Sequence, residues 1–276
     1  MKYIDSIIGG LIAFLVFIIL VLLLPGKGPS DDVKLILTVS TFLFAILAGF
    51  FIARSSSRFN HIRQTVGTED ALFLALYKTS QVYGKKFQNK IRELIDKYYV
   101  VAYDVELASQ SAYKENMPYF LKIWDLVTKL KGAASSKIID ILKDLEINRN
   151  LATTISKEKI AKGQWAVLIV LSLIIIFSLF YLNTNEFYSM IVTILLSTVL
   201  IIVLLILRDL QNLKFGGEAL LSESGQEVFE VMGKLRYYNI SYMDQGWYKV
   251  PKSIKKYRLG YHKLGEKPDI RIIVNN

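Results

Sequence analysis

The sequence predicts an all-α integral membrane protein with four transmembrane helices, a helical cytoplasmic domain and a short β-like or extended C-terminal tail. Three observations lead to this fold class: four long windows without a charged residue, an uneven distribution of Lys and Arg among the segments between them, and helical spacing of apolar residues in the longest hydrophilic segment. Hydrophobic residues make up 53% of the 276 residues, slightly more than in an ordinary soluble domain.

Each charge-free window is long enough to cross a membrane. A helix needs about 20 residues to span a hydrocarbon core of about 30 Å. The first window is longer than the apolar core of a signal peptide, and no small-residue cleavage motif follows it, so we expect it to be a retained span. The windows cover residues 6–24, 35–53, 165–182 and 187–207.

The charge of the connecting segments predicts the orientation. Segments 25–34 and 183–186 together hold two lysines, whereas segment 54–164 holds nineteen Lys and Arg residues and the tail from Arg208 holds twelve. Cation-rich segments near spans stay on the cytoplasmic side. We therefore expect a multi-pass protein of the inner (cytoplasmic) membrane with both its N- and C-termini in the cytoplasm.

The chain accordingly divides into four predicted parts. They are residues 1–53 with transmembrane helices 1 and 2, residues 54–164 as a cytoplasmic helical region, residues 165–207 with transmembrane helices 3 and 4, and residues 208–276 as a cytoplasmic C-terminal helix and basic tail.

Helix signals subdivide the cytoplasmic helical region. Thr68, followed by two acids, predicts a helix start, and Gly84 predicts a break. Apolar spacing predicts a further helix over residues 118–131. The next helix begins near Ser135 or Ser136 and is expected to run toward Trp165, so that the third span continues it.

The tail changes character along its length. A short helix is expected over residues 218–235, and the later runs GWYKV, KYRLGYH and IRIIV are typical of short strands or an extended arm. Its basic cluster either faces anionic lipid, which attracts juxtamembrane cations, or forms a solvated face packed on a neighbouring element. The cluster consists of Lys252, Lys255, Lys256 and Arg258.

Several function classes are disfavoured. The chain has no cysteine, and its two histidines, His61 and His262, stand alone and are expected at the surface or at helix ends, so we predict no metal site and no cofactor. No catalytic constellation or Gly-rich phosphate loop occurs, which argues against an enzyme. The net charge of +10 is explained by the orientation bias, and we expect no nucleic-acid partner.

The second span carries the most specific pattern. Phe42, Ile46 and Phe50 are spaced four residues apart and form one stripe on a helix. Gly49 lies beside the stripe, where a small residue permits close helix packing. Such a stripe faces lipid, a neighbouring helix or a pore.

Motifs around this span resemble a known family. Residues 49–52 (Gly-Phe-Phe-Ile), followed by Ser57 and Arg58, resemble the second-span signature of bestrophin anion channels. Residues 147–169, which lead to a Trp at the third span, and the run RDLQNLKFGG after the fourth resemble the bacterial bestrophin-like domain family. The resemblance covers roughly residues 35–236. Phe59 stands where bestrophins have Trp, Leu213 stands where Pro is expected, and the calcium-binding acidic cluster of animal bestrophins has no counterpart.

The resemblance implies a homo-oligomer, most often a pentamer, with the second span nearest the axis. It implies that Phe42, Ile46 and Phe50 form a hydrophobic pore neck, that Gly49 packs near the pore, and that inorganic anions pass through. Two alternatives stay open: a non-conducting membrane scaffold or signalling protein whose cytoplasmic helices bind a partner, and a stator-like energy-transducing subunit. The latter ranks third because all five prolines lie outside the spans.

Overall fold

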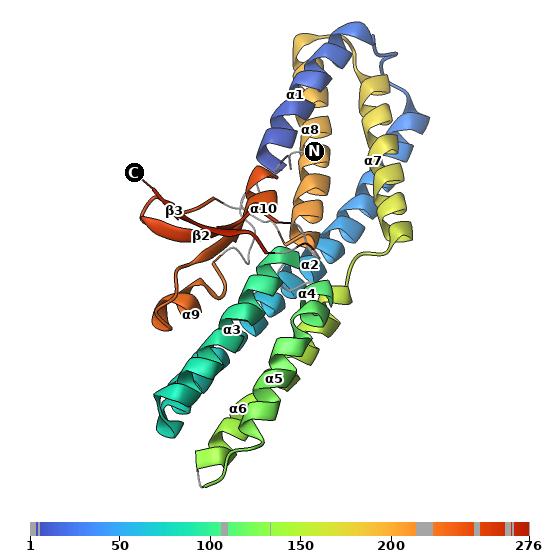
Figure 1. Cartoon of the computed structure of the whole chain (residues 1–276). Coiled ribbons are helices and arrows are strands. Elements are labelled where there is room, and N and C mark those ends of the chain that lie inside the picture. Colours follow the sequence, from blue (N-terminus) through green and yellow to red (C-terminus); the bar gives the residue numbers. More distant parts are fainter. Residues whose placement is uncertain are drawn as a thin grey trace. The chain divides into compact units, whose positions relative to one another are not determined.

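The computed structural model describes residues 4, 6–105, 110–132, 134–213, 223–245, 249–262, 266 and 268–275. It confirms a mostly helical fold with four long apolar helices and a small C-terminal three-stranded sheet (Figure 1). The helices are α1 (Ser6–Leu23), α2 (Asp31–Ser80), η1 (Gln81–Tyr83), α3 (Lys85–Val105), α4 (Gln110–Glu115), α5 (Met117–Val127), α6 (Ala134–Lys157), α7 (Lys162–Leu182), α8 (Phe187–Gln211), α9 (Gln226–Val231) and α10 (Ile240–Asp244). The strands are β1 (Tyr237–Asn239), β2 (Lys256–Gly260) and β3 (Ile270–Val274).

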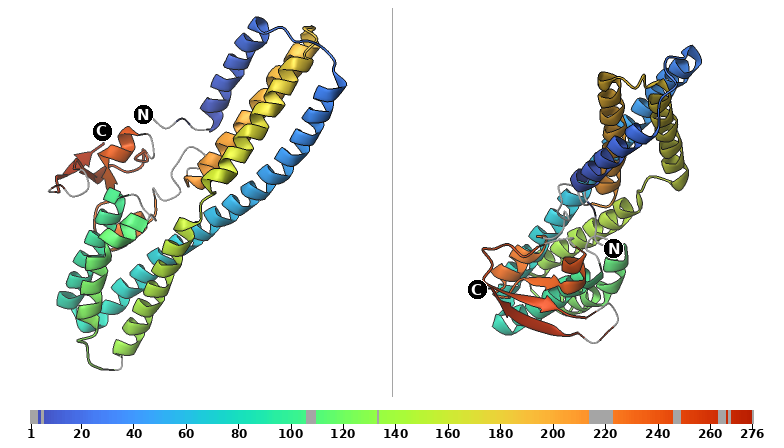
Figure 2. Two further views of the ribbon diagram at one scale, coloured as in Figure 1. Left: turned by 90° about the vertical axis from the view of Figure 1, so that its right-hand side faces the viewer. Right: turned by 90° about the horizontal axis from the view of Figure 1, so that it is seen from above.

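The chain forms two compact units, which we describe separately. The span unit comprises Tyr3–Phe59 and Lys159–Gly217, and the hydrophilic unit comprises Met1–Lys2, Asn60–Glu158 and Glu218–Asn276. Helix α2 contributes to both, since it is one uninterrupted helix (Figure 2).

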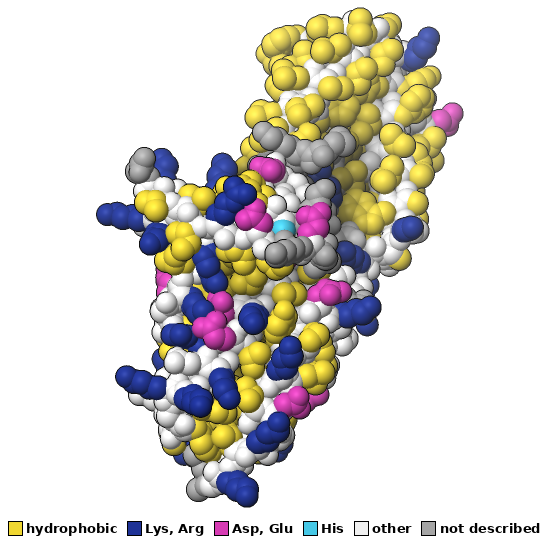
Figure 3. All heavy atoms as spheres, viewed as in Figure 1, with side chains coloured by type: hydrophobic (Ala, Val, Ile, Leu, Met, Phe, Trp, Pro, Cys, Tyr) yellow, Lys and Arg dark blue, Asp and Glu magenta, His cyan; other side chains and the backbone are white. Residues whose placement is uncertain are grey.

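The span unit contains four helices, α1, α2, α7 and α8, that are long and apolar enough to cross a membrane. Hydrophobic side chains cover its surface, as expected of a multi-pass membrane protein (Figure 3). Gly9 and Gly10 let α1 pack closely on α8, because a Cβ atom on Gly10 would lie 2.8 Å from the side chain of Ile202. The buried core between α2, α7 and α8 consists of Phe44, Ala48, Phe51, Ile160, Leu168, Ile175, Leu179 and Leu207.

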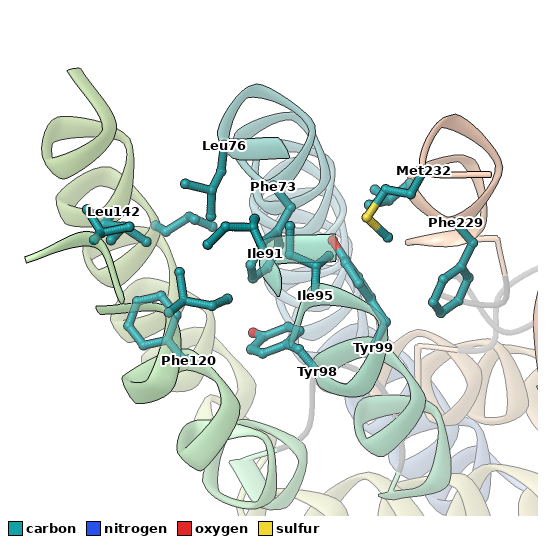
Figure 4. Close-up of a cluster of buried hydrophobic side chains, with 14 of the residues drawn as sticks. Phe73, Leu76, Ile91, Ile95, Tyr98, Tyr99, Phe120, Leu142, Phe229 and Met232 are labelled. Carbon is teal, nitrogen blue, oxygen red and sulfur yellow. The ribbon is translucent and has the colours of Figure 1, made fainter. Parts of the chain in front are cut away.

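The hydrophilic unit has its own aromatic-rich core. Helix α3 lies at its centre. The C-terminal part of α2 and the helices α5, α6 and α9 pack against the apolar side chains of α3. Figure 4 shows these side chains converging, among them Phe73, Leu76, Ile91, Ile95, Tyr98, Tyr99, Phe120, Leu142, Phe229 and Met232. The core gives this unit a stable framework of soluble-protein type.

Two predicted helix boundaries are wrong and one is confirmed. No helix starts at Thr68, because α2 continues to Ser80. The third span does not continue the preceding helix, because α6 ends at Lys157 and α7 begins at Lys162. Gly84 does end a helical segment, and its φ of +88° is a conformation that favours glycine.

The C-terminal sheet has the strand order β1-β2-β3, with β1 parallel and β3 antiparallel to β2. Strands β2 and β3 coincide with the predicted runs KYRLG and IRIIV. The first run, GWYKV, lies partly outside the described residues, and the predicted helix over 218–235 is observed only as α9 within the part that the structure describes.

Asp104, near the end of α3, anchors this sheet to the helices of the hydrophilic unit. Its Oδ1 accepts hydrogen bonds from the Tyr237 hydroxyl at 2.6 Å and from Asn239 Nδ2 at 2.8 Å, and its Oδ2 lies 2.8 Å from His262 Nε2. His262 is therefore buried, which corrects the expectation of a surface residue.

Candidate functional site

Helix α2 presents two different faces within the span unit. Phe44 and Phe51 are each 5% exposed and belong to the core with α7 and α8. The predicted neck residues point elsewhere: Phe42 is 66%, Ile46 is 54% and Phe50 is 60% exposed. These three side chains follow one another about one helical turn, or 5.4 Å, apart. They form a continuous apolar stripe that the subunit itself leaves uncovered.

Small residues flank this stripe. A Cβ atom built on Gly49 would meet no atom within 4 Å, and Ala45 and Ala53, one turn before and after it, are exposed. Small side chains at this spacing allow another helix to approach closely in a membrane. The face that contains the stripe therefore carries only small side chains at these three positions.

Exposure alone does not identify what covers the stripe. Apolar side chains are also exposed on the other three spans, for example Ile7 on α1, Leu173 on α7 and Val199 on α8. Lipid, another subunit and a pore would each meet such a surface. The stripe is distinguished by its position beside Gly49 and by the motifs that follow it.

The motif residue Arg58 joins the ends of three spans. It is buried on α2, and its Nη1 donates a hydrogen bond to the backbone carbonyl of Gln211, the last residue of α8, at 2.9 Å. The side chain of Gln211 accepts a hydrogen bond from Trp165 Nε1, in the first turn of α7, at 2.6 Å. A cation at a helix C-terminus is favourable, because unpaired carbonyls give that end a partial negative charge. Ser57, the other motif residue, is exposed.

A second contact fixes the start of α1. Asp209, buried on α8, accepts a hydrogen bond from the backbone N–H of Ser6 at 2.9 Å, which satisfies one of the free N–H groups at the α1 N-terminus. Arg208 lies 2.7 Å from the Asp209 carboxylate. The three segments that carry the family resemblance thus meet in the span unit through Arg58, Trp165 and the run that contains Asp209 and Gln211.

The hydrophilic unit contains a buried polar network that the sequence did not predict. Glu69 of α2 accepts hydrogen bonds from the hydroxyls of Tyr98 and of Tyr113, the latter at 2.8 Å. Arg149 of α6 donates to the Tyr98 hydroxyl and, at 3.2 Å, to Asn116 Oδ1. Burial raises the pKa of Glu69, and the Arg149 guanidinium and the two hydroxyls offset part of that rise.

Asp70 makes a parallel set of contacts on the adjacent side of α2. It accepts hydrogen bonds from the Tyr99 hydroxyl at 2.6 Å and from the backbone N–H of Gly225 at 2.9 Å. Burial raises the pKa of Asp70, and the hydrogen bonds from Tyr99, Gly225 and Ser224 lower it in part. Glu69 and Asp70, expected to begin a helix, instead bind tyrosines from α3. The sequence signal for this network is the pair of adjacent acids, which the structure places in the interior of α2.

The network offers no evident metal chemistry. Its carboxylates are surrounded by tyrosine hydroxyls and an arginine, and no group of three or more His, Asp or Glu residues that could hold a metal occurs among the residues that the structure describes. The arrangement locks α2, α3, α4 and α6 together.

The predicted lipid-facing cluster is split. Lys252, Lys255 and Lys256 are exposed on and before β2. Arg258 is not, because its guanidinium lies 2.7 Å from Asp96 of α3 and 4.7 Å from the ring centroid of Phe229. Arg258 therefore stabilises the sheet on its own unit, which corrects its assignment to the lipid-facing set.

Comparison with known protein families matches one family model, the Bestrophin-like domain, over residues 9–224. This stretch contains most of α1, the other three spans, the α2 stripe, the Arg58 contacts and the Glu69 network, and it ends before the C-terminal sheet. No curated protein matches the chain, and no solved structure matches it.

Proposed function

The chain belongs to the bestrophin-like domain family, and on that premise we propose that it forms a homo-oligomeric, anion-conducting channel whose neck is the stripe Phe42, Ile46 and Phe50. The observation that carries this proposal is the division of α2 into a packed face and an uncovered apolar face within one subunit.

A ring of subunits would give the uncovered face a role. With α2 nearest the axis, and with five subunits as in the bestrophin channels that the motifs resemble, the stripe makes three stacked apolar rings. Ions crossing them lose hydration without gaining polar partners, so the closed state conducts poorly. The small residues beside the stripe allow neighbouring copies of α2 to approach.

The composition of the spans favours passive conduction. No window of the four spans contains a Lys, Arg, Asp, Glu or His residue. Proton-coupled and ion-coupled transporters place carboxylates or histidines within the membrane. A pore that works by opening and closing an apolar constriction needs none of these groups.

The charge distribution supports an orientation with both termini in the cytoplasm. On this topology the hydrophilic unit, whose Lys and Arg residues outnumber its acids, lies on the cytoplasmic side. Inorganic anions then pass between the cytoplasm and the opposite side of the inner membrane.

The alternative of a non-conducting scaffold rests on one surface feature. The hydrophilic unit carries a surface groove of about 530 Å³ between α3 and α5, with an apolar floor at Leu94 and Leu126. A groove of this size suits a partner segment as well as a channel regulator.

Planar-bilayer recording of the purified chain separates the two functions. We expect discrete openings whose reversal potential follows the anion gradient, and ring-shaped particles of identical subunits in images of the same preparation. Rings without any current would favour the scaffold, and a monomer in mild detergent would contradict both the neck and the oligomer. A mock preparation without the chain is the control.

A further inference from the structure

Strand β3 forms an uncovered edge of the C-terminal sheet. It is the last strand in the order β1-β2-β3, and Ile270, Ile272 and Val274 are all exposed, Ile272 and Val274 by about 60% (59% and 63%). Alternate residues of a strand point to the same face. The three side chains therefore form one aliphatic row beyond the part of the sheet that packs on helices.

The backbone of β3 is uncovered on the same edge. The hydrogen bonds Tyr261 N to Asp269 O and Asn275 N to Lys255 O flank the ladder between β2 and β3. Hydrogen-bonded and non-hydrogen-bonded pairs alternate in an antiparallel ladder. The backbone N–H and C=O groups of Arg271 and Ile273 therefore point toward β2, and those of Ile270, Ile272 and Val274 point outward. Within the described part of the chain no strand pairs with this edge.

Positive charge lies near the Val274 end of the row. Residues 249–276 contain eight Lys and Arg residues and two acids. Lys256 is the cross-strand partner of Val274 and so lies on the face of the aliphatic row. Lys252 and Lys255 are exposed nearby, and one of the two acids, Asp269, already pairs with Arg271 at 2.7 Å. Figure 3 shows Lys and Arg side chains beside hydrophobic ones toward the C-terminal end.

We propose that this edge docks on the surface of a bilayer that contains anionic phospholipid, with Ile270, Ile272 and Val274 at the boundary between headgroups and acyl chains. Charge complementarity selects this occupant: the three exposed lysines near Val274 attract phosphate headgroups, and the aliphatic row beside them gains from leaving water. The outward N–H and C=O groups stay hydrated at headgroup level, since they could not be buried unpaired in hydrocarbon. Docking depends on membrane insertion of the spans and does not depend on conduction.

The absence of cysteine from the chain allows a direct test. The full-length Ile272→Cys variant, labelled with an environment-sensitive fluorophore, is placed in nanodiscs of phosphatidylcholine alone or of phosphatidylcholine with phosphatidylglycerol. We expect a blue-shifted emission and quenching by spin-labelled lipid in the anionic nanodiscs only. The matched control is Lys137→Cys on α6, which is also exposed and should give the same emission in both lipids.

A second variant keeps the test decisive. Replacing Lys252, Lys255 and Lys256 with Gln in the Ile272→Cys background should abolish the blue shift, and high salt should reduce it. Equal emission at residue 272 in the two lipids would overturn lipid docking. A blue shift that is the same in both lipids and is not quenched by spin-labelled lipid would also overturn it and would indicate that another protein strand covers β3. If Ile272→Cys misfolds, the same emission measurement can be made on a label at residue 274 of the same row, in the Val274→Cys variant.

Discussion

Phe50 and Phe51 are consecutive residues with ring centroids 5.6 Å apart, yet Phe51 is buried against α7 and α8 whereas Phe50 is exposed. One residue step along a helix turns the side chain by about 100°, which is enough to separate the packed face of α2 from the uncovered one. The two phenylalanines therefore form a matched pair of the same chemistry in different environments.

The first prediction uses this pair to compare packing. Phe51→Ala should lower the free energy of unfolding of the detergent-solubilised protein by about 3–5 kcal/mol, because it leaves a cavity in the core of the span unit. Phe50→Ala removes only the ring contact with Phe51 and leaves no cavity in that core, so it should lower stability much less. Equal losses would show that the uncovered face also packs tightly in the assembled protein.

The second prediction concerns the helix-end contact of Arg58. Arg58→Met should cost about 1.5–3 kcal/mol, since the Gln211 carbonyl loses a charged hydrogen-bond donor. Arg54→Met, at an exposed position one turn earlier, should cost much less. Thermal unfolding of the two variants in one detergent makes the comparison, and equal midpoints would contradict a structural role for Arg58.

The third prediction concerns the buried cation of the hydrophilic unit. Arg149→Met leaves Glu69 without its cationic neighbour and removes the donors to Tyr98 and Asn116, so it should destabilise the unit by about 3–5 kcal/mol. Lys143→Met on the exposed side of α6 should change stability by less than about 0.5 kcal/mol. A tolerated Arg149→Met would mean that the network does not hold these helices together.

The fourth prediction follows from the raised pKa of Asp70. Folding favours the protonated form of the Asp70 carboxyl. The contribution of Asp70 to the stability of the folded state is therefore fully present below the ordinary pKa of 3.8 and is lost as the pH rises through the raised pKa. The stability of Asp70→Asn relative to the wild type should therefore increase with pH, by about 1.4 kcal/mol for each unit between the two pKa values.

Unfolding midpoints measured from about pH 4 to about pH 8 check this, because titrations common to both proteins cancel in the difference. The control Asn150→Ala, at an exposed position on α6, changes no ionisable group and should show a constant difference from the wild type. A constant difference for Asp70→Asn as well would contradict the burial cost assigned to this carboxylate.

The spans were predictable from sequence because membrane insertion is decided locally, by runs of about 20 residues without charge. Strands β2 and β3 were predictable from their β-branched and aromatic composition. The break between α6 and α7 was not, because residues 158–161 have no proline or glycine to signal it. It is fixed in the structure by the Gln164 side chain, which accepts a hydrogen bond from the Ala161 N–H.

The site was predictable only in part. Helical spacing placed Phe42, Ile46 and Phe50 on one stripe and Phe44 and Phe51 off it, but which of the two faces packs against α7 and α8 needed the neighbouring helices. The buried network joins residues 29 to 51 positions apart in sequence, as in the bonds of Tyr98 to Glu69 and to Arg149. No local pattern specifies such pairings, so adjacent acids in α2 were taken for a helix start.

The most direct test of the channel compares the rate at which anions leak from liposomes that contain the wild type or one of two sets of α2 variants. The triple replacement of Phe42, Ile46 and Phe50 by Ala should widen and wet the constriction and raise the flux above that of the wild type. The control pair Phe44→Ala and Phe51→Ala removes large apolar side chains from the packed face of the same helix. This pair should lower stability and leave the anion flux close to that of the wild type. If the triple variant assembles normally and leaks no faster than the wild type while the control pair leaks as much or more, the stripe is not the neck of a pore.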